Sequence, residues 1–114
     1  MRPGLTRDAE CLIERHVHSV GTLDLLLLLR ERPTCALSTT AICELLRCPS
    51  GWATEELGRL CAAELLVAEG GGHRYAPATA RLRAAVDSAA AARQRDRAAV
   101  ERLIFAPRRR IAGG

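Results

Sequence analysis

The middle of the chain, residues 37–75, reads LSTTAICELLRCPSGWATEELGRLCAAELLVAEGGGHRY. Ser38 is a favourable N-cap, and the apolar residues behind it recur at helical spacing, which predicts a first helix. Cys48-Pro49 predicts a turn. Ser50 is expected to cap a second helix, which runs to about residue 63 with its leucines on the buried face.

A hairpin is expected directly after the second helix. Two short apolar runs, residues 65–69 and 73–76, flank the glycines at 70–72. Glycines give the backbone the freedom that a tight reversal needs, so this pattern predicts two antiparallel strands. Pro77 is expected to end the second strand.

The segment before residue 37 is expected to be mainly helical. A short helix is expected over residues 8–17, and Ser19 is expected to cap a helix that contains the leucine run 25–29. A helix that is apolar nearly all round has to be covered on most sides, so we interpret it as the central core helix. It is expected to end before Pro33, and residues 33–37 form a connection or a short strand.

The last third of the chain predicts one long helix from Thr79 to about Phe105, with room for a bend. An unbroken helix of that length would extend about 40 Å, so part of it is expected to project or to fold back. The expected organisation is a helical and hairpin domain with an N-terminal helical extension over 1–76, a C-terminal helical segment over 77–106 and a disordered basic tail over 107–114.

The composition bounds the fold class and the partners. Apolar residues make up 48% of the 114 residues and charged residues 26%, an ordinary balance for one folded domain. The many alanine, leucine, arginine and glutamate residues and the few strand formers favour a mainly α fold, to which the hairpin pattern adds a small β-hairpin. Aromatics are only 3%, which disfavours a protein that stacks the bases of single strands. All 17 basic residues are arginines, and ten lie in residues 73–114 beside three acidic residues, so attraction for a polyanion is expected there.

The order of core helix, helix, short turn, helix, hairpin and C-terminal helix resembles the winged helix-turn-helix family of bacterial transcriptional regulators, over roughly residues 20–76. The resemblance implies a helix-turn-helix over 39–63 and a wing over 65–76 that act on double-stranded DNA. In this family the second helix presents its first turn to the major groove, and the wing lies over an adjacent groove or the phosphate backbone.

The resemblance places the DNA contacts at the end of the first helix, at the start of the second and on the wing. Helix-start amides favour phosphate oxygens, a glutamate accepts a hydrogen bond from cytosine, and a wing arginine suits a narrow minor groove. The candidate DNA-binding residues are Arg47, Ser50, Gly51, Trp52, Thr54, Glu55, Arg59 and Arg74. The alternatives are a packed Trp52, a solvated face that includes Glu55 and Glu56, and a solvent-facing Arg74.

A homodimer is expected, because a palindromic site needs two readers and because the last helix has an alanine-lined apolar face. The candidate dimerisation residues are Leu82, Ala85, Val86, Ala89, Ala92, Val100 and Leu103. The alternative is a monomer in which that helix folds back over the leucine-rich helix.

The alternative function is a winged-helix module that no longer reads DNA and binds protein, with its arginine-rich last helix docked on an acidic partner.

The cysteines and histidines predict no metal site. The five cysteines are odd in number and contain no CxxC pair, so we expect reduced thiols, most of them small core residues and Cys48 the most exposed. A redox-sensing pair of Cys43 and Cys48 stays open as an alternative. His16 and His18 are two residues apart and point in different directions on a helix, so they cannot share a metal.

Catalysis and cofactor binding are not expected either. The sequence has no glycine loop for a nucleotide and no nucleophile–base constellation, so we expect a protein that is not an enzyme and has no cofactor. The longest apolar run, residues 25–29, is far shorter than the roughly 20 residues of a membrane span, and the N-terminus lacks the apolar core of a secretory signal. These features predict a cytoplasmic protein.

Overall fold

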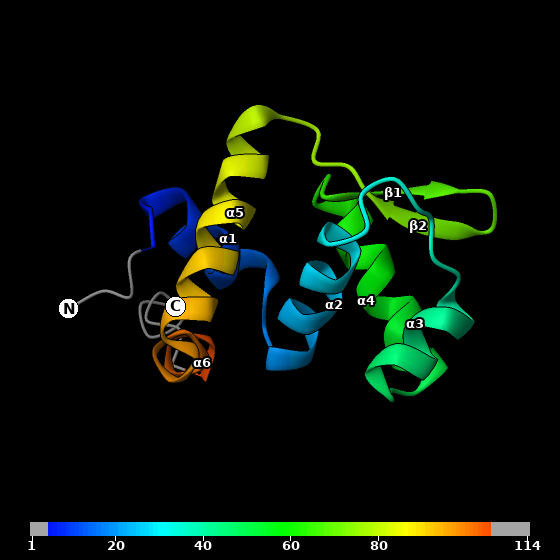
Figure 1. Cartoon of the computed structure of the whole chain (residues 1–114), viewed down its shortest axis with the longest axis horizontal. Helices are drawn as coiled ribbons and strands as arrows, with labels where there is room; N and C mark the ends of the chain where they lie inside the picture. The colour runs from blue at the N-terminus through cyan, green and yellow to red at the C-terminus, as the bar shows by residue number, and fades with distance from the viewer. Residues whose placement is uncertain (1–4, 106–114) are drawn as a thin grey trace, which may run out of the picture.

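The computed structural model describes residues 5–105 (Figure 1). They form a mainly helical fold with one small antiparallel sheet, which confirms the expected coarse class. The elements in chain order are α1 (Arg7–His16), α2 (Val20–Arg30), α3 (Thr39–Leu46), α4 (Ser50–Ala62), β1 (Leu66–Glu69), β2 (Gly72–Tyr75), α5 (Ala80–Arg95) and α6 (Arg97–Phe105). No helix in this range is long and apolar enough to cross a membrane.

Helix α2 is the central helix, as its leucine run predicts. The Ser19 side chain caps it by accepting a hydrogen bond from the Thr22 N–H at 3.1 Å. Leu25, Leu26 and Leu29 belong to a core cluster shared with α3, α4 and the hairpin, whereas Leu23 belongs to a second cluster shared with α1, α5 and α6. Both sides of α2 are therefore covered, which explains why it tolerates apolar residues nearly all round.

The C-terminal segment is two helices and not one continuous long helix, and the break between them lies where the expected segment had room for a bend or a fold-back. At Asp96 the backbone leaves the helical region, with φ −151° and ψ 81°. The Asp96 carboxylate then accepts a hydrogen bond from the Ala99 N–H at 3.1 Å, which is the interaction of an N-cap residue. Helix α6 turns back, and Val100 and Ile104 are buried in the second core cluster.

All seven candidate dimerisation residues pack inside the chain itself. The five that are at most 3% exposed are Ala85, Val86, Ala89, Ala92 and Val100. Leu82 and Leu103 are half-buried and pack against the same two clusters. These side chains therefore contribute to the core of a single chain, and the five buried ones offer almost no surface to a second copy.

The two ends of the described chain lie side by side. Helix α1 packs chiefly along α5. The Thr6 N–H donates to Ser88 Oγ at 3.0 Å, and the Arg81 guanidinium donates to the Asp8 carboxylate at 2.9 and 3.0 Å. The expected domain over 1–76 and the expected C-terminal segment share both core clusters, because each cluster contains residues from before and after position 76. The expected tail at 107–114 lies outside the described residues.

The hairpin forms as predicted, with Leu66 opposite Tyr75 and Glu69 opposite Gly72. Gly70 and Gly71 have positive φ angles of 55° and 81°, a conformation that glycine adopts without strain. Leu37 adds an isolated antiparallel bridge to His73, so the 33–37 connection does make a strand-like contact. This bridge ties the segment before α3 to the hairpin.

Candidate nucleic-acid interface

Three residues, Arg47–Pro49, join α3 to α4. Arg47 takes the left-handed conformation with φ 56°, and the N–H groups of Arg47 and Cys48 both donate to the Cys43 carbonyl oxygen. Pro49, not Ser50, is the N-cap of α4, which corrects the expected cap. A proline side chain cannot accept a hydrogen bond, so the amide groups in the first turn of α4 have no side-chain cap.

The start of α4 is exposed on the side away from the core. Its exposed residues include the candidates Ser50, Gly51, Thr54 and Glu55. Arg47, before the helix, and Arg59, two turns along it, are also exposed. The structure thus brings six of the eight candidate DNA-binding residues to the surface of one helix and its preceding turn.

Trp52 is half-buried and packs against α2, as in the alternative of a packed tryptophan. A Cβ atom built on Gly21 would lie 3.1 Å from the Trp52 ring, which shows how closely the indole approaches the α2 backbone. Trp52 therefore helps to fix the start of α4 on α2. This packing restricts how far its ring can reach toward a ligand.

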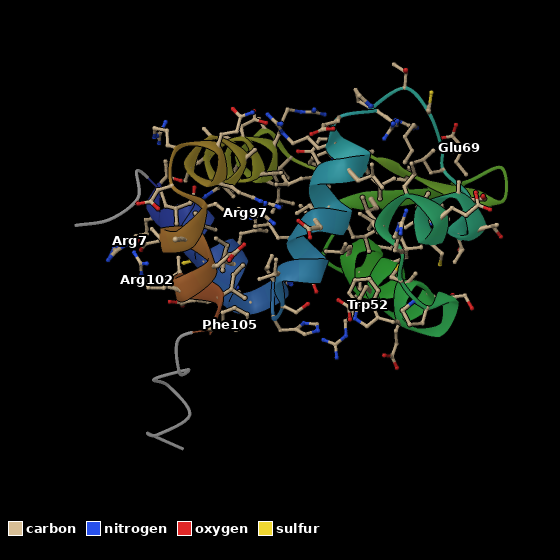
Figure 2. The ribbon with its side chains drawn as sticks, turned by 60° about the horizontal axis from the view of Figure 1, so that its bottom comes forward. Arg7, Trp52, Glu69, Arg97, Arg102 and Phe105 are labelled. Atoms are coloured by element: carbon tan, nitrogen blue, oxygen red, sulfur yellow. The ribbon has the colours of Figure 1, made fainter. Side chains whose placement is uncertain are left out.

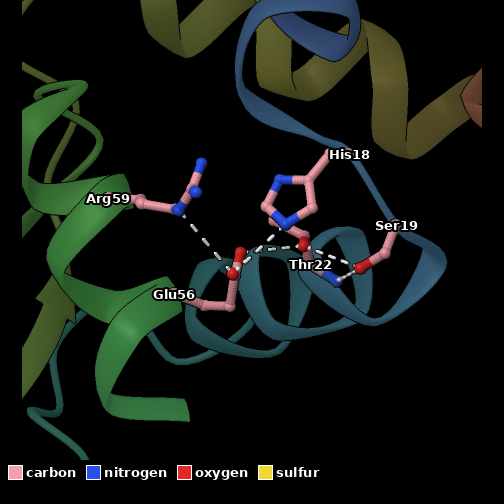
Figure 3. A network of polar contacts seen from close by, with 5 residues as sticks. All are labelled: His18, Ser19, Thr22, Glu56 and Arg59. Carbon is pink, nitrogen blue, oxygen red and sulfur yellow. Dashed lines mark hydrogen bonds and ion pairs between the residues drawn. The ribbon is translucent and has the colours of Figure 1, made fainter. Parts of the chain in front are cut away.

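The inner face of α4 holds a buried carboxylate that the sequence analysis missed (Figure 3). Glu56 is 2% exposed, although the solvated-face interpretation included it. Thr22 Oγ1 donates to Glu56 Oε1 at 2.9 Å, and His18 Nε2 lies 3.3 Å from Glu56 Oε2. Arg59 Nε lies at 3.9 Å from the same oxygen. Buried carboxylates require such partners, so Glu56 pins α4 to the start of α2.

The hydrogen bonds of this network show which hydroxyl group donates to which oxygen. The Thr22 hydroxyl gives its one proton to Glu56, so the Ser19 hydroxyl donates to Thr22 Oγ1 at 2.9 Å. Ser19 Oγ accepts in return from the Thr22 N–H. The N-cap of α2 and the inner face of α4 are therefore parts of one hydrogen-bonded chain. A signal for Glu56 existed in the sequence, because residue 56 falls at helical spacing among Ala53, Leu57 and Leu60.

The wing arginine is engaged within the hairpin. Arg74 lies within β2, not at the turn, and its Nε donates to Glu69 Oε1 at 2.8 Å. The Arg74 side chain is 32% exposed and paired with Glu69, which differs from the alternative of a solvent-facing arginine at the hairpin tip. Gly72 lies directly against the Leu37 backbone, where an added Cβ would be 2.6 Å from the carbonyl oxygen. The hairpin is therefore held close to the segment that leads into α3.

The charges of the described chain balance. Residues 5–105 contain thirteen arginines and thirteen acidic residues, and the net charge of +4 comes from Arg2 and the three arginines at 108–110. In Figure 2, Arg7, Arg97 and Arg102 lie around α6, at the end of the molecule opposite Trp52 and Glu69. The arginines of the C-terminal helices therefore do not surround the exposed start of α4.

A groove of about 580 Å³ separates α2 from α5. Its charged walls are paired: Arg30 meets Asp87 at 3.0 Å, and Arg93 pairs with Asp24. These ion pairs link the two helices. Among residues 5–105, no three metal-ligating side chains gather into a group that could hold an ion.

No cysteine lies in the core, which corrects the prediction that most would be core residues. Cys11 and Cys35 are exposed, and Cys43, Cys48 and Cys61 are half-buried. Cys48 is thus not the most exposed thiol. Burial raises the pKa of the Cys61 thiol and that of the Cys48 thiol.

Comparison with models of known protein families, with curated proteins and with solved structures finds no match to this chain. The assignment of a function therefore depends on the geometry above.

Proposed function

We propose that α3 and α4 form a DNA-binding helix-turn-helix and that the protein regulates transcription through double-stranded DNA. One observation supports this most directly. The first turn of α4 is exposed with uncapped amides, while the opposite face of the same helix is buried and pinned by Glu56 and Trp52. A helix held in this way offers its start to a phosphate or a base edge without rearrangement.

Each exposed residue of the first turns has a role in this proposal. Ser50 and Thr54 donate hydroxyl protons to phosphate oxygens or to base edges. Gly51 has no atom within 4 Å of an added Cβ, so the DNA backbone can approach it closely. Glu55 accepts a hydrogen bond from a cytosine amino group.

The cations around this surface neutralise phosphates. Arg47 and Arg59 are exposed at the turn and on α4, and Arg59 lies 3.9 Å from Glu56. Arg74 contacts phosphate from the hairpin by exchanging its partner Glu69 for a phosphate oxygen. That exchange makes Arg74 the weaker contributor, because it loses one ion pair to gain another.

The test is fluorescence anisotropy with duplexes selected from a random pool, titrated with potassium chloride. We expect the logarithm of the association constant to fall linearly with the logarithm of salt concentration. Arg47→Ala and Arg59→Ala should each reduce that slope by about one per bound protomer. Arg95→Ala is the matched control, because Arg95 is exposed at the last residue of α5, and α2 lies between α5 and α4 (Figure 1). Failure to select any duplex at low salt would contradict the proposal.

A second candidate function is a protein-binding module that uses the same fold without DNA. The observation that favours it is charge: residues 20–76 contain five arginines against seven acidic residues, and Arg74 already pairs with Glu69. In that case an acidic partner docks on α5 and α6, where Arg95 and Arg102 are exposed. A partner that binds the wild type but not an Arg95→Glu, Arg102→Glu variant, together with no DNA binding, would support this candidate over the first.

A homodimer on a palindromic site is part of the first proposal. Because the alanine-lined face is buried within one chain, the contact between copies must use another surface. Light scattering at micromolar concentration tests it, and the mass of one chain both free and on a palindromic duplex would refute the dimer.

A further inference from the structure

Two thiols meet at the end of α3. The left-handed Arg47 reverses the backbone, and the Cys48 N–H donates to the Cys43 carbonyl oxygen at 3.2 Å. This six-to-one hydrogen bond belongs to the Schellman type of helix end, in which the side chains at its two positions come into contact. Here both positions are cysteines, so this helix end brings their side chains to the same place, and the neighbouring Cys43 contributes to the raised pKa of the Cys48 thiol.

The other thiols have different surroundings. Cys11 lies on α1, Cys35 in the connection before α3, and Cys61 near the end of α4. Cys43 and Cys48 are both half-buried, so a small oxidant reaches them, whereas a bulky thiol partner does not pack easily against them. The backbone hydrogen bond at the helix end keeps these two residues next to each other.

We propose that Cys43 and Cys48 form a thiol pair that a peroxide-class oxidant converts into an intramolecular disulfide. One thiolate attacks a peroxide oxygen, the O–O bond breaks, and a sulfenic acid and hydroxide form; the hydroxide takes up the proton that the thiol released and leaves as water. The second thiolate displaces the sulfenic oxygen as another water, so that two thiols and one hydrogen peroxide give one disulfide and two waters. This chemistry does not depend on the proposed DNA binding.

The rate should depend strongly on pH. Burial, followed by the contact with Cys43, raises the pKa of the Cys48 thiol. Because only thiolates react, the rate should rise by about tenfold per pH unit until the attacking thiol is ionised. The pair is therefore expected to respond slowly at neutral pH and to yield a persistent link when oxidised.

Peptide mapping tests the link directly. Trypsin cleaves after Arg47, so Cys43 and Cys48 fall in separate peptides, residues 31–47 and 48–59. Cys35 shares the first peptide and is replaced in a Cys35→Ser background. The reduced, folded protein is treated with hydrogen peroxide, alkylated and digested. We expect the two peptides to appear joined, lighter than their sum by two hydrogens, and to separate on reduction.

Two further variants fix the assignment. Cys43→Ser should abolish the joined peptides, and Cys61→Ser, which removes a half-buried thiol outside the pair, should leave their yield unchanged. If peptide 48–59 is instead recovered alkylated, over-oxidised or joined to a peptide other than 31–47, the proposal is wrong. The digest of the Cys35→Ser monomer, separated from cross-linked copies on a non-reducing gel, decides this alone, so the conclusion stands even when Cys43→Ser does not fold.

Discussion

Replacing Thr22 by valine tests how α4 is held in place. Thr22 is fully buried, and its hydroxyl donates to Glu56 Oε1 at 2.9 Å. Valine has nearly the same shape, so the substitution removes the donor and very little packing. Glu56 remains buried on α4 and loses the hydrogen bond to one of its carboxylate oxygens.

The remaining contacts of Glu56 set how much the free energy of unfolding falls in Thr22→Val. A hydrogen bond to a charged group contributes about 1.5–3 kcal/mol, and threonine and valine have similar helix propensities. His18 and Arg59 stay near the other oxygen, at 3.3 and 3.9 Å, so the carboxylate is not left without a partner. We therefore expect Thr22→Val to lower the free energy of unfolding by about 2 kcal/mol.

Urea unfolding measures this loss through the fluorescence of Trp52 and the helical circular dichroism. With a urea slope of about 1–3 kcal/mol per molar, the midpoint should fall by about 1 M. Thr54→Val is the matched control, because Thr54 is exposed on α4 and should change the midpoint little. Adding Glu56→Leu to Thr22→Val should recover part of the loss, since an apolar pair needs no donor. Equal midpoints for the two valine variants would refute the stabilising role of this hydrogen bond.

Three further outcomes are expected. Gly72→Ala should lower the free energy of unfolding by about 1–3 kcal/mol in urea titrations, because its Cβ would meet the Leu37 backbone, and a variant as stable as wild type would contradict that contact. Gly58→Ala should raise it by about 1 kcal/mol, because Gly58 lies in open space within α4 and alanine favours helix. The hydrogen bond from Arg81 lowers the pKa of Asp8 below its ordinary value of 3.8, so the stability it contributes is present above that pH and lost below it. Asp8→Asn should therefore lower the melting temperature more at pH 7 than at pH 2, and an equal decrease at both would argue against the pairing.

Local signals in the sequence predicted the elements well. Ser19 and Ser38 cap helices as expected, because an N-cap depends on the residue and its immediate neighbours. The hairpin glycines likewise act locally, through their own backbone angles. Asp96 carries the same type of local signal, and the break between α5 and α6 follows from its cap, which the alanine periodicity around it obscured.

The partners that side chains meet in the folded chain account for what the sequence could not predict. Glu56 is buried because Thr22, thirty-four residues earlier, supplies its donor. Arg74 is engaged because the hairpin register brings Glu69 within 2.8 Å. The alanine face of α5 is covered by α1, at the other end of the chain. None of these pairings follows from helical or strand periodicity, because periodicity fixes which face is apolar but not what covers it.

The packing of α1 on α5 has a consequence for synthesis on the ribosome. A nascent chain that has emerged through β2 already contains α2, α3, α4 and the hairpin, and can bury most of the cluster around Leu26 and Leu57. Helix α1, although made before the other helices, lacks its main packing partner until α5 leaves the exit tunnel. Much of its apolar side, with Ile13 and Ala9, thus stays open to chaperones until the segment that contains α5 has been translated.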